Sequence, residues 1–354
     1  MRAALWELHH RYGQVNSVDS AETQISARQL NYRSVKDLNR IIVDNLYRVP
    51  RDVDLIVGVP RSGALAANLL ALHLNLPLTD VSGYVSGRLM GKGMHRAEIL
   101  QHAESVSACR RVLVIDDSIL TGSEMRRVRE VVGSAGLTEK TIFSAVFYVA
   151  DRVNDIDLGF ELCDAPREFE WNLMHGQSLS NCFVDIDGVL CIDPTDEEND
   201  DGARYVEFIR SARPYLKPSA RIGTLITARL EKYREHTMAW LAEQNIEYDN
   251  LIMMNYATMQ ERQAAQKYAE FKATAYARSN AALFIESEDA LAADIARISG
   301  KPAICVATHN IYDPSGIPLA RETLKAKVRQ SRSFFERGRN KLARTVRAIN
   351  SRGG

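Results

Sequence analysis

Two successive series of short apolar runs, each alternating with helix-like stretches, set the strongest limit on how this 354-residue chain can fold. Strands are predicted in the first series at 54–60, 111–115 and 142–149, and in the second at 182–185, 221–226, 250–254, 281–285 and 303–306. Strands that alternate with helices form parallel sheets covered by helices. The predicted fold class is therefore α/β, with two doubly wound parallel-sheet domains followed by a basic helical C-terminal tail.

The expected domain boundaries lie where this alternation weakens. Residues 1–33 are an N-terminal extension and possible hood, 34–164 the first domain, 165–181 a linker, 182–310 the second domain and 311–354 the basic tail. The first helix is expected to begin at Ser34, because Ser34 and Asp37 have the spacing of a capping box. A chain of this length is typical of two domains.

The composition argues against several classes of protein. The formal net charge is zero, so the molecule as a whole has no bias toward nucleic acid or membrane. The five cysteines are odd in number and form no CxxC pair, which favours free buried thiols over a disulfide framework or a zinc site. No apolar run is long enough for a signal peptide or a membrane span. We therefore expect a soluble cytoplasmic protein with no membrane partner.

The most informative segment of the first domain is Val-Leu-Val-Ile-Asp-Asp-Ser-Ile-Leu-Thr-Gly over residues 112–122. A buried strand is expected to end in Asp116 and Asp117, and a turn with Thr121 and Gly122 leads into a helix. Backbone N–H groups of such a turn and of a helix N-terminus bind anions. The two carboxylates beside them can accept hydrogen bonds from sugar hydroxyls. A ribose 5-phosphate fits this arrangement; the alternative is a strand–turn–helix with surface acids.

This segment resembles the signature by which type I phosphoribosyltransferases bind phosphoribosyl pyrophosphate (PRPP). The resemblance implies that Asp116 and Asp117 hold the ribose 2′- and 3′-hydroxyls, and that the 5-phosphate lies on the loop Ser118, Ile119, Leu120, Thr121 and Gly122. It further implies Mg²⁺, displacement of pyrophosphate (PPi) at the ribose C1 by a base-like acceptor, and a homo-oligomer. In this family a hood holds the base, which points here to residues 1–33 or 150–178.

Two upstream segments match other parts of this family's site. Arg61, Ser62 and Gly63 follow a strand and open a helix, as the PPi loop of the family does, although Arg61 alone could be a solvated loop residue. Residues 84–96 contain three glycines and three cations, as in the family's flexible loop that closes over the reacting centre. Arg88 and Lys92 in this loop, together with Arg96, are candidate contacts for PPi.

Two acids spaced i and i+2 follow the first strand of the second domain, in Asp185-Ile-Asp187-Gly188. One such carboxylate can attack phosphorus while the other protonates the leaving oxygen. The segment resembles motif I of the haloacid-dehalogenase (HAD) superfamily, which implies that Asp185 is the nucleophile and Asp187 the general acid/base. Both residues would also bind Mg²⁺, Asp187 through its backbone carbonyl. Taken alone, the motif could equally be a turn.

The remaining HAD motifs follow in order. The resemblance implies that Thr227 binds the phosphoryl group and that Lys272 neutralises its charge. Glu286 and Asp289 would complete the Mg²⁺ site, with Glu286 standing where the family usually has Asp. The acidic stretch 193–201, with six carboxylates, is expected to be a solvated loop rather than a flap over this site.

Together the two resemblances predict a bifunctional enzyme that joins phosphoribose to a base-like acceptor and then hydrolyses a phosphomonoester, the resulting nucleotide. Two alternatives are a HAD phosphatase regulated by a non-catalytic PRPP- or nucleotide-sensing domain, and a nucleic-acid-associated phosphatase. The last would bind nucleic acid through residues 321–354, which contain eleven Lys or Arg and two Glu. This segment could equally be a helix packed on its own protein. Phe169 and Trp171 are expected to pack between the domains rather than stack on a base.

Overall fold

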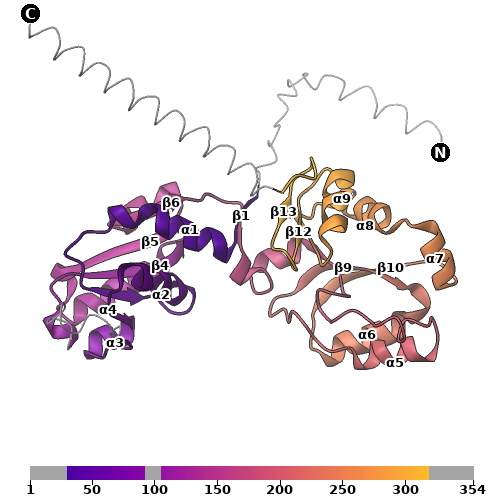
Figure 1. Ribbon diagram of the computed structural model, residues 1–354, viewed down its shortest axis with the longest axis horizontal. Coiled ribbons are helices and arrows are strands. Elements are labelled where there is room, and N and C mark those ends of the chain that lie inside the picture. Colours follow the sequence, from indigo (N-terminus) through magenta and orange to yellow (C-terminus); the bar gives the residue numbers. More distant parts are fainter. Residues whose placement is uncertain (1–29, 92–104, 319–354) are drawn as a thin grey trace, which may run out of the picture.

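The computed structural model describes residues 30–91 and 105–318, which form two α/β lobes (Figure 1). In the N-terminal lobe five parallel strands lie in the order β3-β2-β4-β5-β6. These strands are β2 (Leu55–Gly58), β3 (Leu78–Asp80), β4 (Val112–Ile119), β5 (Thr141–Tyr148) and β6 (Leu158–Leu162). β2 and β4 are buried along almost their whole length, because helices cover both faces of the sheet.

Four helices cover this first sheet in two layers. α1 (Val35–Asn45) and α2 (Ser62–Leu74) contribute to one core cluster, and α3 (Val81–Ser86) and α4 (Ser123–Ser134) to the cluster on the other face. The predicted capping box is confirmed: the Ser34 hydroxyl accepts the Asp37 N–H at 3.1 Å, and the Asp37 carboxylate accepts the Ser34 N–H at 3.1 Å. These bonds satisfy N–H groups that the first turn of a helix leaves free.

The C-terminal lobe contains a six-stranded sheet in the order β10-β9-β8-β11-β12-β13. Its strands are β8 (Cys182–Val184), β9 (Ile222–Leu230), β10 (Tyr248–Met254), β11 (Leu283–Glu286), β12 (Ala303–Cys305) and β13 (Ile311–Tyr312). All pairs are parallel except β12–β13. Its helices are α5 (Ala203–Ser211), α6 (Arg234–Glu243), α7 (Met259–Ala265), α8 (Tyr268–Ala277) and α9 (Asp289–Ser299). α5 and α6 pack on one face and α8 and α9 on the other.

Two strands that carry predicted site residues extend further toward their carboxyl ends than the sequence predicted. β4 does not end before the paired acids but continues through Ile119, and β9 continues through Leu230. The polar residues in both extensions hid the strands from the apolar pattern. Pairing with the neighbouring strand carries β4 onward, since Ser118 and Ile119 stay in register with Phe147 and Tyr148 of β5.

The segment predicted as a linker, residues 165–181, is folded. It contains β7 (Arg167–Phe169), followed by the 3₁₀ turns η5 (Glu170–Asn172) and η6 (Gln177–Asn181). β7 pairs in parallel with β1 (Asn31–Arg33), so the two segments considered as the hood meet in one small sheet.

The predicted tail begins inside the second lobe, because β13 pairs with β12. Residues 319–354, which hold nearly all of the tail, lie outside the described residues, as do Lys92 and Arg96. Within the described part of the chain, no helix is long and apolar enough to span a bilayer. All five cysteines are free and buried, which confirms the prediction from their number and spacing.

A substitution at Gly223 measures how tightly β9 packs against the chain that precedes β8. A methyl group at Gly223 would lie 2.2 Å from the backbone oxygen of Ser180, a contact that only a backbone shift can relieve. We expect Gly223→Ala to lower the free energy of unfolding by about 1–3 kcal/mol. Gly133→Ala in α4 is the matched control, because its nearest new contact is at 3.5 Å and alanine favours a helix. Equal urea midpoints for the two variants would contradict this account.

Candidate functional site

The carboxyl ends of the parallel strands in the first lobe meet at one edge of the sheet, and the predicted site residues lie there. Asp116 and Asp117 of β4 are 8% and 3% exposed. Burial and the neighbouring charge of Asp117 raise the pKa of Asp116 well above its usual range. A methyl group at Gly63 would lie 2.6 Å from Oδ1 of Asp116, so glycine is needed where α2 begins against β4.

Asp117 is held by one donor on each carboxylate oxygen. The Ser62 hydroxyl donates to Oδ1 at 2.6 Å, and the Trp171 indole Nε1–H donates to Oδ2 at 2.9 Å. The expectation that Trp171 packs between the domains did not include this contact: the indole also reaches the predicted ribose site. No local pattern around Trp171 indicated this contact, which joins residues 54 positions apart.

The predicted phosphate loop is shorter in the structure, because Ser118 and Ile119 belong to β4. The loop proper runs from Leu120 to Gly122, which has φ +73° and caps α4. The Thr121 and Ser123 hydroxyls are 2.8 Å apart at the start of the helix. Arg126, which the sequence did not single out, donates to the Thr121 carbonyl at 3.1 Å and steadies the loop.

A pocket of about 640 Å³ adjoins this loop. Its lining residues are Asn31, Leu120, Val149, Ala150, Asp151, Arg152, Asp164 and Ala165, which come from the carboxyl ends of the central strands and from the start of the β1–β7 sheet. Ligands of parallel α/β sheets bind at this edge. The pocket therefore has the position expected of a substrate site.

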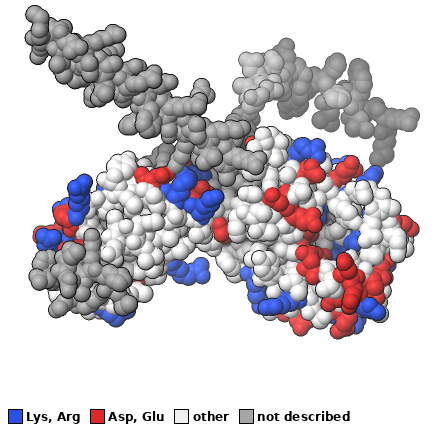
Figure 2. Space-filling model, in the orientation of Figure 1, with Lys and Arg blue, Asp and Glu red and all other residues white. Residues whose placement is uncertain are grey.

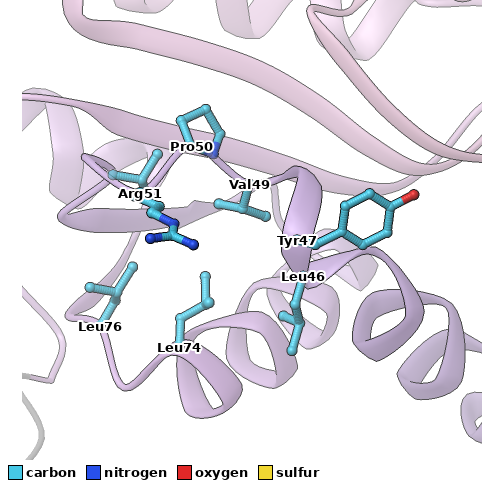
Figure 3. A pocket seen from close by; sticks show the side chains of 8 residues that line it. Leu46, Tyr47, Val49, Pro50, Arg51, Leu74 and Leu76 are labelled. Atoms are coloured by element: carbon cyan, nitrogen blue, oxygen red, sulfur yellow. The ribbon is translucent and has the colours of Figure 1, made fainter. Parts of the chain in front are cut away.

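A second pocket of about 310 Å³ lies elsewhere in the N-terminal lobe (Figure 3). Its lining residues are Leu46, Tyr47, Val49, Pro50, Arg51, Val53, Leu74 and Leu76. They precede β2 or follow α2, so this pocket lies at the amino edge of the sheet, away from the paired acids.

Arg61 and Arg88, the candidate PPi-binding cations that lie within the described residues, are at the carboxyl edge and face solvent. Arg61 is exposed immediately before α2. The Arg88 side chain is 57% exposed, and its Nη2 lies 3.5 Å from Oδ1 of Asp80, the last residue of β3. Both guanidinium groups are accessible to an anion bound at this edge.

In the C-terminal lobe, Lys272 joins two buried acids. Its Nζ lies 2.6 Å from Oδ2 of Asp185 and 2.7 Å from Oε2 of Glu286, and all three residues are at least 95% buried. Burial opposes the charge of Lys272, but the two carboxylates together raise its pKa. Burial and the charge of Glu286 raise the pKa of Asp185, while Lys272 works against that shift. The predicted residues just after β8, within α8 and at the end of β11 therefore meet in one ionic cluster.

The remaining oxygens of this cluster differ in their partners. Glu286 Oε1 accepts the Ser287 N–H at 2.9 Å, whereas the buried Asp185 Oδ1 has no hydrogen-bond partner among the described residues. Asp289 does not join the cluster: its carboxylate accepts bonds from Thr308 and Asn310 at 2.5 and 3.3 Å. In the structure the Asp289 carboxylate is therefore engaged with the loop after β12.

Arg229 is a site residue that the sequence analysis missed. Its fully buried guanidinium makes a two-pronged contact with Asp187, Nε to Oδ2 at 3.0 Å and Nη2 to Oδ1 at 2.6 Å. Burial opposes the charge of Arg229, but Asp187 outweighs it and raises the pKa of the guanidinium. Thr227 is also fully buried, and its hydroxyl accepts a hydrogen bond from the backbone N–H of Arg229 at 3.1 Å. The only available signal was the position of Arg229 two residues after Thr227.

The acidic stretch 193–201 is not simply a solvated loop. Asp200 Oδ1 accepts the N–H groups of Gly202 and Tyr205, which fixes the start of α5. Asp201 accepts the Tyr233 hydroxyl at 2.8 Å and the Met259 N–H at 3.0 Å. Asp200 therefore fixes the local start of a helix, whereas Asp201 joins elements from distant parts of the chain.

Arg229 and Arg221 provide a matched pair for measuring what burial adds to an ion pair. Removing a buried cation leaves its partner without compensation, so we expect Arg229→Met to lower the free energy of unfolding by about 3 kcal/mol. Arg221 pairs with Glu247 and Asp249 at the surface, and Arg221→Met should cost less than about 1 kcal/mol. Urea unfolding measures the loss of unfolding free energy in each variant. Equal losses in the two variants would contradict a stronger role for the buried ion pair of Arg229 with Asp187.

Comparisons with known proteins bear on the N-terminal lobe. Residues 21–159 match the family described as "Phosphoribosyl transferase domain". The amidophosphoribosyltransferase of Synechococcus elongatus is 34% identical over 100 residues, covering 25% of this chain and 20% of that protein. The amidophosphoribosyltransferase of Lachancea kluyveri is 27% identical over 143 residues, covering 37% of this chain and 27% of that protein.

A solved structure, the Helicobacter pylori xanthine-guanine-hypoxanthine phosphoribosyltransferase, is 15% identical with a TM-score of 0.30, covering 40% of this chain and 92% of that chain. The curated relatives are much longer than the matched region, since this chain spans only 20% and 27% of their lengths. The match of residues 21–159 includes the whole segment with the paired acids. This region of the chain is therefore a phosphoribosyltransferase domain of type I.

Proposed function

We propose that this chain is a bifunctional enzyme that transfers phosphoribose from PRPP to a base-like acceptor and hydrolyses a phosphomonoester. The first activity is supported by the paired acids of β4 beside a helix N-terminus, in a domain of the phosphoribosyltransferase family. The second is supported mainly by the buried cluster of Lys272 with Asp185 and Glu286 at the carboxyl edge of a parallel sheet.

In the N-terminal lobe, the ribose hydroxyls bind Asp116 and Asp117, and the 5-phosphate binds at the loop that opens α4. The exposed guanidinium groups of Arg61 and Arg88 at the same edge attract PPi. The acceptor binds in the adjoining pocket, close to the β1–β7 sheet. The bond between C1 and the PPi oxygen breaks as the bond from C1 to the acceptor nitrogen forms, and the proton of the acceptor N–H passes to PPi or to water. Positive charge develops on the ribose, so nearby carboxylates stabilise the transition state.

The first activity is tested by mixing the full chain with PRPP, Mg²⁺ and a panel of purine, pyrimidine and related bases, followed by ³¹P NMR. We expect PPi to appear with one class of base. Asp117→Asn should slow PPi formation at least about tenfold, since it removes a charge that binds the ribose. Asp52→Asn is the control, because Asp52 forms an exposed pair with Arg111 at the amino edge. Absence of PPi with every base would overturn this activity.

In the C-terminal lobe, a carboxylate oxygen of Asp185 attacks phosphorus and the ester P–O bond breaks. Asp187 gives a proton to the leaving oxygen, and later takes one from the water that hydrolyses the aspartyl-phosphate. Lys272 offsets the charge that gathers around the phosphoryl group. Thr227 offers its hydroxyl to a phosphoryl oxygen. Arg229 holds Asp187 in one orientation through its two-pronged contact.

The residues of this cluster fit a Mg²⁺ ion. Within the described ranges, no group of three or more His, Cys, Asp or Glu side chains forms a ready metal cage. Mg²⁺ does not need one, since it keeps several waters and binds proteins through one or two carboxylates. The unpartnered, buried Asp185 Oδ1 and the Asp187 carbonyl are the ligands we assign, with Glu286 beside them. When bound, the ion would neutralise negative charge on the phosphoryl oxygens.

The second activity is tested by phosphate release from added nucleoside 5′-monophosphates in Mg²⁺. We expect Asp185→Asn to abolish release, because an amide oxygen is a poor nucleophile and cannot form the aspartyl-phosphate. Asp196→Asn is the matched control: Asp196 is an exposed acid of the stretch 193–201. Unchanged phosphate release in Asp185→Asn would overturn the assignment of this cluster.

If both activities occur, the first makes the nucleotide that the second dephosphorylates, and one chain yields a nucleoside. PPi production separates this scheme from a sensor domain that controls a phosphatase. A nucleic-acid substrate is less favoured, because Asp and Glu gather over the C-terminal lobe on the face shown in Figure 2. Negative surface of this kind repels a phosphate backbone.

A further inference from the structure

The carboxylate of Asp117 is fixed by two donors that come from separate parts of the chain. Ser62 begins α2 and donates to Oδ1, whereas Trp171 lies in η5 and donates to Oδ2. One donor on each oxygen prevents the carboxylate from rotating. Each oxygen of a carboxylate can accept more than one hydrogen bond, so both keep capacity for a ribose hydroxyl.

The indole ring is itself held in place by an aromatic stack. Trp171 and Phe169 lie with their ring centroids 4.9 Å apart and their planes 16° apart. Phe147 belongs to β5, the strand beside β4. Its ring centroid lies 5.3 Å from that of Phe169 and 6.5 Å from that of Trp171. Because Phe147 belongs to the sheet that carries Asp117, this stack sets where the indole N–H points.

The chain on either side of Trp171 is anchored in both lobes. Glu170 Oε2 accepts the Val35 N–H at the start of α1 at 2.8 Å, and its Oε1 lies 3.6 Å from Nδ1 of His309 in the C-terminal lobe. Leu173 and Met174 are buried in the core cluster of the C-terminal lobe. The turn that carries the indole therefore lies against the second lobe just before Trp171 and is anchored in the core of that lobe at Leu173 and Met174.

We propose that Trp171 is a positioning residue of the PRPP site, which holds Asp117 in the orientation that receives a ribose hydroxyl. The proposal rests on the proposed PRPP-binding function of the N-terminal lobe. It also implies that the ribose site is completed by a segment belonging to both lobes. Without the indole donor, Asp117 would adopt several orientations, and PRPP would have to select one of them.

The test is isothermal titration of the full chain with PRPP and Mg²⁺, comparing wild type with Trp171→Phe. Phenylalanine keeps a stacking ring but has no N–H donor. Hydrogen bonds to charged groups are the stronger class, so we expect PRPP to bind roughly tenfold more weakly. The KM for PRPP should rise while kcat stays within about twofold, because orientation of Asp117 acts on the bound ground state and the transition state alike.

Two further measurements separate positioning from general loss of structure. Ser62→Ala removes the donor to the other oxygen and should weaken PRPP binding in the same direction, whereas Ser62→Thr, which keeps a hydroxyl, should restore most of it. The thermal midpoint and far-UV circular dichroism of Trp171→Phe should stay close to wild type. If the variant has lost its fold, the Ser62 pair decides whether orientation of Asp117 governs PRPP affinity.

The possible outcomes are distinct. Wild-type affinity in Trp171→Phe would overturn the role of Trp171 and leave the proposed function intact. Tighter binding would also overturn it, because the indole would then compete with ribose for Asp117. A wild-type chain that does not bind PRPP at all would overturn the proposed function, and the role of Trp171 in that site with it.

Discussion

Both candidate sites depend on carboxylates that are buried at the carboxyl edge of a parallel sheet. A buried charge without partners costs several kcal/mol, so each such acid must be met by donors or cations from other elements. Ser62 and Trp171 meet Asp117, and Lys272 meets Asp185. The surrounding helices and turns pack so that these donors and cations lie against the buried acids. The need to compensate each buried carboxylate therefore links both sites to the packing of the lobes.

The two lobes satisfy this requirement with different chemistry. In the N-terminal lobe the partners of Asp117 are neutral donors, which leave a negative site suited to sugar hydroxyls and to a ribose that becomes positive. In the C-terminal lobe the partners are Lys272 and Arg229, whose fixed positive charges suit an incoming phosphoryl group. Charges that are already oriented need no rearrangement when the reaction occurs, which is the main source of electrostatic catalysis.

The segment between the sheets connects the two lobes more closely than a linker would. Within a few residues, Trp171 of η5 contacts Asp117 in one lobe, and Leu173 and Met174 lie in the core of the other. The proposed PRPP site is therefore completed by a segment that also belongs to the core of the second lobe.

The sequence by itself determined the alternating elements, the capping box at Ser34, the free cysteines and the acids near the carboxyl ends of strands, because apolar periodicity and helix caps are encoded by neighbours along the chain. It did not reveal the bonds Trp171–Asp117, Arg229–Asp187 and Met259–Asp201, which join residues 54, 42 and 58 positions apart. Nor could it show that the Asp289 carboxylate accepts a hydrogen bond from the Thr308 hydroxyl. Such contacts depend on how strands and helices pack, and no local pattern records which distant donor will face a buried acid.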